Sequence, residues 1–169
     1  MIGGLDIYIR NSIVYSNKGF EYVIVHGDND KSTPVVKNGT PIKEYQIPLH
    51  RELNVWNDMR SIISSIQIIR IEKPDIIHCH SAKGGVVGRI AGFLTNTKTF
   101  YTPHAFSFLS SKSKFINFVY LVIERMMKLN SYLLACSDSE RDLGVTKVHY
   151  THEHALVWNN AVPDALLLL

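Results

Sequence analysis

Apolar residues recur at helical spacing in several stretches of the chain, and short β-branched runs lie between them. The most regular repeat covers residues 54–72 and consists of Trp56, Met59, Ile62, Ile63, Ile66 and Ile69. Residues three and four apart share one face of a helix, so this stretch predicts a helix with one apolar face. Pro74 marks its end, because proline interrupts the hydrogen bonds of a helix.

The same criteria predict the remaining elements. Helices are expected over residues 5–18, 84–94 and 112–129, with a last helix that begins near Ser137. Strands are expected over residues 21–26, 75–80, 98–102, 131–136 and 155–158, with a further short strand within residues 41–48. Strands that alternate with helices are typical of βαβ units. The pattern therefore predicts an α/β fold with a parallel sheet.

Composition and charge limit the classes of protein that remain. The chain has 169 residues, of which 46% are hydrophobic and 20% are charged. These values are ordinary for one globular domain and exclude a disordered or fibrous protein. The formal net charge of +3 is mild and lacks the Lys/Arg block expected of a nucleic-acid groove. It favours anionic ligands such as sugar phosphates or acidic lipid headgroups.

The sequence favours a reducing, cytoplasmic setting. The start of the chain lacks the basic and apolar regions of a signal peptide, and no run approaches the ~20 apolar residues of a membrane span. Cys79 and Cys136 both fall within predicted strands. We therefore interpret them as small buried hydrophobic residues and not as a disulfide framework.

Glycines and histidines follow two neighbouring strands of the predicted sheet. His80, Lys83 and Gly84 come at or just after the end of strand 75–80, and His104 follows strand 98–102. In open α/β sheets ligands bind outside the carboxyl ends of the strands, so both exits are expected to open onto one crevice. Glycine lets the backbone approach a ligand closely, and Lys83 offers a cation to an anionic group.

The histidines admit more than one interpretation. His78 and His80 lie two apart on a strand and share one face, but that face supplies no Asp, Glu or Cys, so a metal site is disfavoured. We interpret His78 as a packed residue and His80 as a polar group that faces the crevice. His104 follows Pro103 and can donate a hydrogen bond to a sugar hydroxyl or to a developing charge, although a purely structural role remains an alternative.

Three further features suggest binding. Gly3 and Gly4 precede a helix whose N-terminal N–H groups can receive a phosphate, or they form a flexible entry. Ser137 and Glu140 have the spacing of a capping box. The segment 106–118, from Phe106 onward, mixes aromatic residues with lysines. It can rest on an anionic membrane surface, or its helix packs inward and leaves the lysines solvated.

Five motifs occur in a characteristic order along nearly the whole chain. They are GGLDIY at residues 3–8, KPDIIHCH at residues 73–80 with the glycines that follow, YTPH at residues 101–104, ACSDSE at residues 135–140 and NNAVP at residues 159–163. In this order they resemble the N-terminal, acceptor-side domain of retaining family 4 glycosyltransferases of the GT-B fold, particularly bacterial enzymes that build surface polysaccharides. The resemblance implies a Rossmann-like parallel sheet with helices on both faces, which is one half of a GT-B architecture.

The resemblance also implies roles for individual residues. Gly3 and Gly4 would face the donor diphosphate, whereas His80, Lys83 and Gly84 would line the acceptor side. His104 would contact the transferred sugar near the reacting carbon. The remaining matched positions are Phe106 in the loop after His104, Ser137 and Glu140 at the mouth of the later strand, and Asn160 before the interdomain linker.

The activity implied is transfer of a sugar from a nucleotide-sugar donor to a saccharide or polyprenyl-linked acceptor, with retention and without a metal ion or other cofactor. Peripheral contact with the inner face of the membrane is a further expectation, and nucleic acid is not an expected partner. The protein would place the acceptor hydroxyl beside the anomeric carbon and stabilise the departing diphosphate.

The chain departs from the family pattern in two ways. Only Met1 and Ile2 precede the first glycines, so the strand that normally lies mid-sheet is expected to be missing and its neighbours to lack ladder partners. Residues 1–164 are expected to form the Rossmann-like domain, with residues 165–169 a tail or the start of a linker. The second, donor-binding domain is expected to lie outside this sequence, and the isolated chain is therefore expected to be inactive.

Two other classes of protein stay open. One is a noncatalytic partner subunit of a two-chain transferase. The other is a GT-B-like sugar-nucleotide epimerase, which is disfavoured because the strand exits supply histidines where such an isomerase relies on carboxylates.

Overall fold

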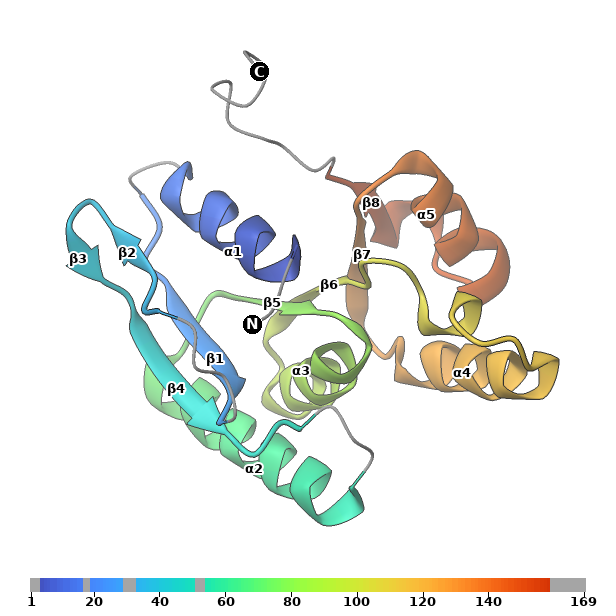
Figure 1. The fold of residues 1–169 in the computed structure, drawn as a ribbon, viewed down its shortest axis with the longest axis horizontal. Coiled ribbons are helices and arrows are strands. Elements are labelled where there is room, and N and C mark those ends of the chain that lie inside the picture. Colours follow the sequence, from blue (N-terminus) through green and yellow to red (C-terminus); the bar gives the residue numbers. More distant parts are fainter. Residues whose placement is uncertain (1–3, 17–18, 29–32, 51–53, 159–169) are drawn as a thin grey trace.

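The computed structural model describes residues 4–16, 19–28, 33–50 and 54–158 of the chain (Figure 1). Strands and helices alternate along most of it, as the hydrophobic pattern predicts. In chain order the elements are α1 (Gly4–Val14), β1 (Val23–Gly27), β2 (Val36–Lys37), β3 (Thr40–Pro41), β4 (Lys43–Ile47), α2 (Val55–Glu72), β5 (Ile76–His80), α3 (Ala82–Thr95), β6 (Lys98–Thr102), α4 (Lys114–Met127), β7 (Ser131–Ala135), α5 (Asp138–Leu143) and β8 (Ala155–Val157).

The strands form a parallel sheet and a separate parallel pair. The sheet has the order β5-β6-β7-β8, and the pair joins β1 to β4. Within the described residues β1 and β5 each have a strand partner on one side only. Figure 1 shows α1 on one side of the strands and α2 and α3 on the other. The α/β fold with a parallel sheet and helices on both faces is thus confirmed.

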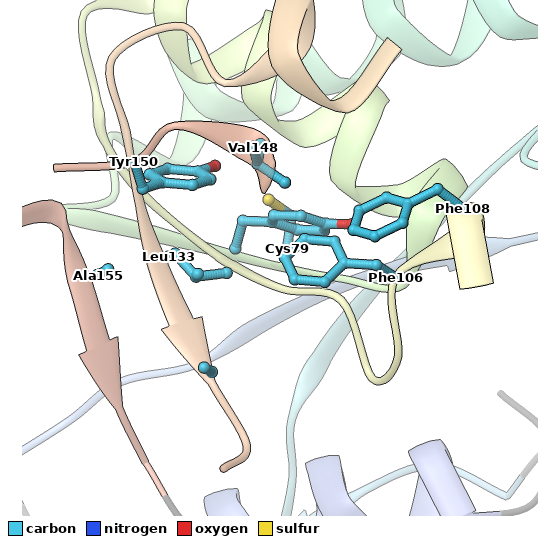
Figure 2. Close-up of a cluster of buried hydrophobic side chains, with 9 residues drawn as sticks. Cys79, Phe106, Phe108, Leu133, Val148, Tyr150 and Ala155 are labelled. Atoms are coloured by element: carbon cyan, nitrogen blue, oxygen red, sulfur yellow. The ribbon is translucent and has the colours of Figure 1, made fainter. Parts of the chain in front are cut away.

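The main core lies around β6 and β7. Tyr101 and Leu133 are fully buried and lie in one cluster with Phe106, Phe108 and Tyr150 (Figure 2). Because successive strand residues point to opposite faces, β6 and β7 give alternate side chains to this core. A smaller cluster of Ile13, Ile24 and Val35 holds α1 against β1. The larger core frames the carboxyl ends of β5, β6 and β7.

Glycines in α3 let this helix approach the sheet closely. A Cβ at Gly85 would lie 2.2 Å from the Tyr101 ring, and one at Gly92 would lie 2.0 Å from Thr99 Oγ1. At Gly88 the obstacle is Cys79 Cβ, at 2.6 Å. The packing role of Gly85 and Gly88 is therefore confirmed. Gly84 is different, because its nearest neighbour would be Ser81 Oγ at 3.7 Å.

The structure corrects several details of the sequence prediction. Helix α3 begins at Ala82, two residues before the predicted start, because the Gly85 N–H already donates to the Ser81 carbonyl. The β2–β3 hairpin was not predicted, although Asn38 and Gly39 both have positive φ, as the two central residues of a type I′ turn require. Cys79 is buried as expected, whereas Cys136 is only half-buried and lies one residue beyond β7. Both cysteines are free thiols.

Candidate functional site

Side chains at the ends of β5, β6 and β7 contact one another at the carboxyl edge of the sheet. His80 ends β5, His104 follows β6, and Cys136 follows β7. Nδ1 of His80 lies 3.2 Å from Nε2 of His104, and Nδ1 of His104 lies 3.6 Å from Sγ of Cys136. The β5 and β6 exits therefore meet at His80 and His104, although the pocket described below is lined by His104 and not by His80.

Burial determines which of these groups carry charge. It lowers the pKa of His80 to about 2, with a smaller contribution from the neighbouring imidazoles of His78 and His104. It also lowers the pKa of His104, which the Glu140 carboxylate partly offsets, and it raises the pKa of the Cys136 thiol to about 11. At neutral pH the two imidazoles are uncharged and Cys136 is a thiol.

Two arrangements of protons fit these distances. In one, the Cys136 thiol donates to Nδ1 of His104, and Nε2–H of His104 donates to Nδ1 of His80. In the other, Nδ1–H of His80 donates to Nε2 of His104, and Nδ1–H of His104 donates to Sγ of Cys136. In both, each ring nitrogen of His104 has a partner, so its neighbours on both sides set the orientation of the ring.

Tyr8 of α1 packs on both imidazoles. Its ring meets His104 edge-on at a centroid distance of 4.8 Å and His80 at 5.7 Å. The contact places the first turns of α1, which begin at Gly4, beside the β5 and β6 exits. Burial raises the pKa of Tyr8, so its hydroxyl is protonated at neutral pH. Sequence reasoning did not single out Tyr8 or the Cys136–His104 contact.

Glu140 joins the β6 exit to the β7 exit. One carboxylate oxygen accepts the N–H of Ala105 at 2.8 Å, and the other accepts the N–H of Cys136 at 2.7 Å. His104 and Ala105 both have positive φ, at 53° and 77°, a conformation that non-glycine residues adopt only when other contacts hold it. Glu140 supplies such a contact. It therefore holds the loop that aims His104.

The capping box at the start of α5 is half confirmed. Ser137 caps the helix, since its Oγ accepts the Glu140 N–H at 3.2 Å. The Glu140 side chain does not return to the N–H of Ser137, because its two oxygens already accept the N–H groups of Ala105 and Cys136. Its role is thus wider than that of a helix cap.

A pocket of about 480 Å³ opens beside His104. Its walls come from the β6 exit, the start of α5 and the short 3₁₀ helix η1 (Ser107–Leu109). The side chains combine one imidazole, two hydroxyls, a thiol and an apolar side. The lining residues are His104, Ala105, Phe106, Leu109, Cys136, Ser137, Ser139, Glu140 and Leu143. Such a mixture suits a ligand with hydroxyl groups and one less polar face.

The structure brings some expected site residues together and places others elsewhere. His104, Phe106, Ser137 and Glu140 line the pocket, although Phe106 is 1% exposed and also packs in the core. Gly84 lies in the first turn of α3, just after His80. Gly3 and Asn160 lie outside the described residues.

Lys83 is engaged outside this pocket. Its ammonium forms an ion pair with Asp58 of α2 at 2.8 Å, and the residue is not among those that line the pocket. It therefore joins α3 to α2 in this structure.

His78 is packed only in part. The residue lies on β5 at the edge of the four-stranded sheet and keeps an exposed surface, but its Nε2 bonds Thr102 Oγ1 at 2.8 Å and desolvation lowers its pKa to about 4. The prediction that His78 and His80 share one face is confirmed by their ring distance of 4.0 Å, with Cys79 buried on the other face.

Among the described residues, no group of three or more His, Cys, Asp or Glu side chains has an arrangement that could hold a metal ion. No helix in the described part of the chain combines the length and apolar character needed to cross a bilayer.

The family model for Glycosyltransferase Family 4 matches residues 2–166. The chain therefore belongs to this family, as the five sequence motifs predict.

Curated bacterial relatives carry related names. The chain is 31% identical over 111 residues to an Escherichia coli UDP-Gal:alpha-D-GlcNAc-diphosphoundecaprenol alpha-1,3-galactosyltransferase. The match covers 64% of this chain and 29% of that protein. It is 28% identical over 116 residues to the capsular polysaccharide biosynthesis glycosyltransferase CapM of Staphylococcus aureus. That match covers 62% of this chain and 30% of CapM. The chain thus matches less than a third of each relative's length.

A solved structure confirms the fold. A UDP-N-acetylglucosamine 2-epimerase superposes with a TM-score of 0.53 over 72% of this chain and 33% of that one, at 15% identity. At this identity the likeness concerns the fold alone, and it is consistent with a Rossmann-like domain of the GT-B type.

Proposed function

We propose that this chain is the acceptor-side domain of a retaining hexosyltransferase that moves a sugar from a nucleotide-sugar donor to a saccharide or polyprenyl-linked acceptor in surface polysaccharide synthesis. The observation that carries the proposal is the position of His104. It stands at the exit of β6 beside a pocket with hydroxyl-binding side chains, in a chain of the glycosyltransferase family. The Escherichia coli relative, whose name specifies a diphosphoundecaprenol acceptor, supports the acceptor class.

In this proposal His104 binds and orients the sugar at the reacting centre. We assign the single N–H of its uncharged imidazole to Nε2, from which it donates to Nδ1 of His80 in the free chain. A sugar hydroxyl in the pocket would take over this donor, while Cys136 keeps the tautomer by donating to Nδ1. An oriented neutral donor places the acceptor beside the anomeric carbon without adding a full charge.

We propose that this chain supplies one side of such a reaction. Gly3 and Gly4 are proposed to face the donor diphosphate, Gly84, Lys83 and His80 to line the acceptor side, and Asn160 to precede a linker to a second domain. The displacement proposed needs no metal ion. The chain spans less than a third of the length of its curated relatives, and we propose that by itself it binds acceptor and transfers no sugar.

The site argues against an epimerase. Glu140 is the one carboxylate among the residues that line the pocket, and its two oxygens accept the N–H groups of Ala105 and Cys136. A carboxylate held in this way is poorly placed to act as a general acid or base, which such an isomerase requires. The epimerase likeness concerns fold only.

A noncatalytic partner subunit makes the same prediction of inactivity for the isolated chain. It differs in requiring a separate nucleotide-binding polypeptide. Co-purification of such a polypeptide with the tagged chain from its native cells would favour the two-chain arrangement over a single transferase.

The membrane is part of the proposal. We assign the reaction to the cytoplasmic side, with peripheral contact at the inner face of the membrane, since a polyprenyl-linked acceptor is held there by its lipid.

The test is a binding measurement with a matched histidine control. A soluble short-chain GlcNAc-diphospho-lipid is titrated into the chain and followed by ligand-observed NMR. His104→Ala is expected to weaken binding roughly tenfold, the effect of losing one well-placed hydrogen bond. His152→Ala, which changes an exposed residue outside the pocket, is expected to leave binding unchanged.

Two outcomes would overturn the proposal. Equal affinities for the His104 and His152 variants would remove the role of the imidazole. Robust sugar transfer by the purified 169-residue chain would contradict the assignment of this chain to the acceptor side alone.

A further inference from the structure

A second cavity lies at the amino ends of β6 and β7, at the opposite edge of the sheet from His104. It has a volume of about 270 Å³, and no residue that lines it also lines the pocket of His104. Its walls come from the last turn of α3, the start of β6 and the start of β7, through residues that include Phe93, Asn96, Thr97, Asn130 and Ser131. We call it the amino-edge cavity.

Arg89 of α3 lines this cavity and has an unused donor. Its side chain is 0% exposed. Nε donates to the Gly85 carbonyl at 2.9 Å, and Nη2 donates to Glu124 at 3.0 Å. Nη1 is the remaining corner of the planar group and meets no acceptor at hydrogen-bonding geometry among the described residues. A buried N–H without an acceptor is costly, which points to an acceptor bound in the cavity.

The position of the Arg89 guanidinium is fixed by its other contacts. It lies 3.9 Å from the centre of the Tyr101 ring, whose hydroxyl donates to Glu124 at 2.9 Å. Glu124 is buried on α4, whereas Phe115 and Phe118 of that helix are 74% and 60% exposed, so the expectation that the helix packs its apolar face inward is wrong. A buried carboxylate without partners would be costly, so these contacts hold both α4 and Arg89 in place.

The charges at the cavity favour an uncharged ligand. Arg89 is neutralised by its ion pair with Glu124. Lys98 also lines the cavity, but its ammonium lies 5.5 Å from the centre of the Phe100 ring, on the face of β6 opposite Thr99. No acidic side chain of the described residues lines the cavity. A charged ligand would therefore leave water without a full counter-charge, which is costly.

The walls of the cavity suit hydroxyl groups. The amides of Asn96 and Asn130 and the hydroxyl of Thr97 can each donate and accept hydrogen bonds, as a sugar hydroxyl does. Phe93 is 56% exposed and gives the rim an aromatic surface, against which the C–H face of a sugar ring can pack. The volume far exceeds the ~10–15 Å³ that one water needs and is just below the ~300 Å³ of the smallest drug-sized pockets. It therefore suits a single ring.

We propose that the amino-edge cavity is a second binding site, which takes one uncharged sugar unit. Nη1 of Arg89 and the amides of Asn96 and Asn130 bind its hydroxyls, and Phe93 packs on its ring. Its benefit to the protein rests on the proposed function, because a saccharide acceptor would be held at a second point, roughly 16 Å from the His104 edge by the length of the five residues of β6.

An NMR titration tests the proposal directly. The ¹⁵N-labelled chain is titrated with the methyl glycosides of glucose, galactose and N-acetylglucosamine to about 50 mM, because one sugar ring is expected to bind with a Kd on the order of 1–10 mM. With at least one of them we expect saturable shifts of the backbone amides of Asn96, Thr97, Asn130 and Ser131. Inorganic phosphate is titrated in parallel and is expected to leave these amides unchanged.

Two matched pairs of variants separate the cavity from the surface around it. Phe93→Ala should weaken binding about fivefold, whereas Leu94→Ala, which removes a neighbouring side chain that is 58% exposed and outside the lining, should not. Asn130→Ala should also weaken binding about fivefold, the effect of one lost hydrogen bond. Its control is Gln67→Ala, at an exposed amide on α2. Circular dichroism checks that all four variants fold.

Arg89→Lys tests the buried donor. It keeps a cation beside Glu124 and removes Nη1, so we expect sugar affinity to fall at least about tenfold, the effect of losing a hydrogen bond from a charged group. If this variant does not fold, the Phe93 and Asn130 variants decide the question.

The outcomes distinguish this inference from the proposed function. Absence of shifts at the amino-edge cavity with every sugar, or equal losses in the control variants, would overturn it. Shifts there with phosphate and not with sugars would overturn the assignment of an uncharged ligand. His104→Ala should leave sugar binding at this cavity unchanged, so acceptor binding at His104 and sugar binding here can each fail alone.

Discussion

The β5–β8 sheet and the β1–β4 pair are both parallel, but they are enclosed to different degrees. In the sheet, β6 and β7 have partners on both sides and share a cluster of nine buried residues. In the pair, the corresponding cluster has three buried residues, and Val23 and Val25 of β1 remain 40% and 39% exposed. Similar β-branched strands thus reach different burial because burial depends on neighbours that a strand does not itself supply.

The difference bears on where the candidate site lies. His104 and Cys136 follow the two doubly paired strands, so their positions are set by a closely packed frame. A site on such a frame is held more accurately than one on an open pair of strands. We therefore expect substitutions in the sheet to affect both stability and acceptor binding, and those in the pair to affect stability less.

The largest effect is expected from the buried ion pair that Arg89 of α3 forms with Glu124 of α4. Glu124→Gln should lower the free energy of unfolding by about 3–5 kcal/mol, because Arg89 would stay buried without its counter-charge. Urea unfolding followed by circular dichroism measures this. The joint change Arg89→Met with Glu124→Leu should recover much of the loss. A Glu124→Gln variant as stable as the wild type would contradict the role of the pair.

The two cores can be compared directly by truncation. Leu133→Ala in the sheet should lower the free energy of unfolding by about 3–5 kcal/mol, whereas Ile24→Ala in the pair should cost about 2–3 kcal/mol. The reason is that Leu133 is fully buried in the larger cluster, while Ile24 lies in a small cluster that can close around the gap. Equal losses in chemical denaturation would remove the contrast between the regions.

Glu140→Gln tests the two hydrogen bonds by which the Glu140 carboxylate connects the segment after β6 to the segment after β7. An amide cannot accept both backbone N–H groups through its two terminal atoms, so one N–H loses its partner at a cost of about 1–3 kcal/mol. Acceptor binding should weaken as well, because the loop that carries His104 is no longer held. Asp142→Asn, at an exposed position on the same helix, is the control. If Glu140→Gln lowers stability and leaves acceptor affinity intact, Glu140 is structural only.

The smallest effect expected is a pH dependence of stability. The pKa of His80 is lowered to about 2 by burial, so the unfolded chain binds a proton near its ordinary pKa of ~6.5 and the folded chain does not. Stability should therefore be full above about pH 6.5 and fall as the pH is lowered, by up to ~1.4 kcal/mol per unit for this group. Urea unfolding from pH 7 to pH 5 measures the slope.

Two variants sharpen the pH measurement. His80→Asn should reduce the slope, because it removes the group that binds the extra proton on unfolding. His152→Asn, at an exposed position, should leave the slope unchanged. A slope that is the same in all three proteins would show that His80 does not contribute to it.

Much of the secondary structure could be predicted because it depends on local periodicity. The repeat of Trp56, Met59 and Ile63 gave helix α2, and Pro74 gave its end. The β2–β3 hairpin was missed, although the Asn38-Gly39 pair is a strong local signal for a two-residue turn. Motif order also identified the family, because the family match covers residues 2–166.

The candidate site was predictable only in part. That His80 and His104 would meet followed from the rule that strand exits share one edge of a parallel sheet. That Glu140 would bond Ala105 and Cys136, and that Tyr8 would pack on both imidazoles, depends on contacts between residues distant in sequence. The orientation of Lys83 toward Asp58 is of the same kind.

The sequence by itself determined the order of strands and helices, the family and the edge at which the histidines meet, because periodicity and motif spacing are local properties. The tertiary structure decided which side of α4 faces solvent and which groups hold the His104 loop. The physical reason is that a buried carboxylate must find its partners wherever the fold supplies them. Glu124 finds Arg89 and Tyr101, and this outweighs the apolar pattern of its own helix.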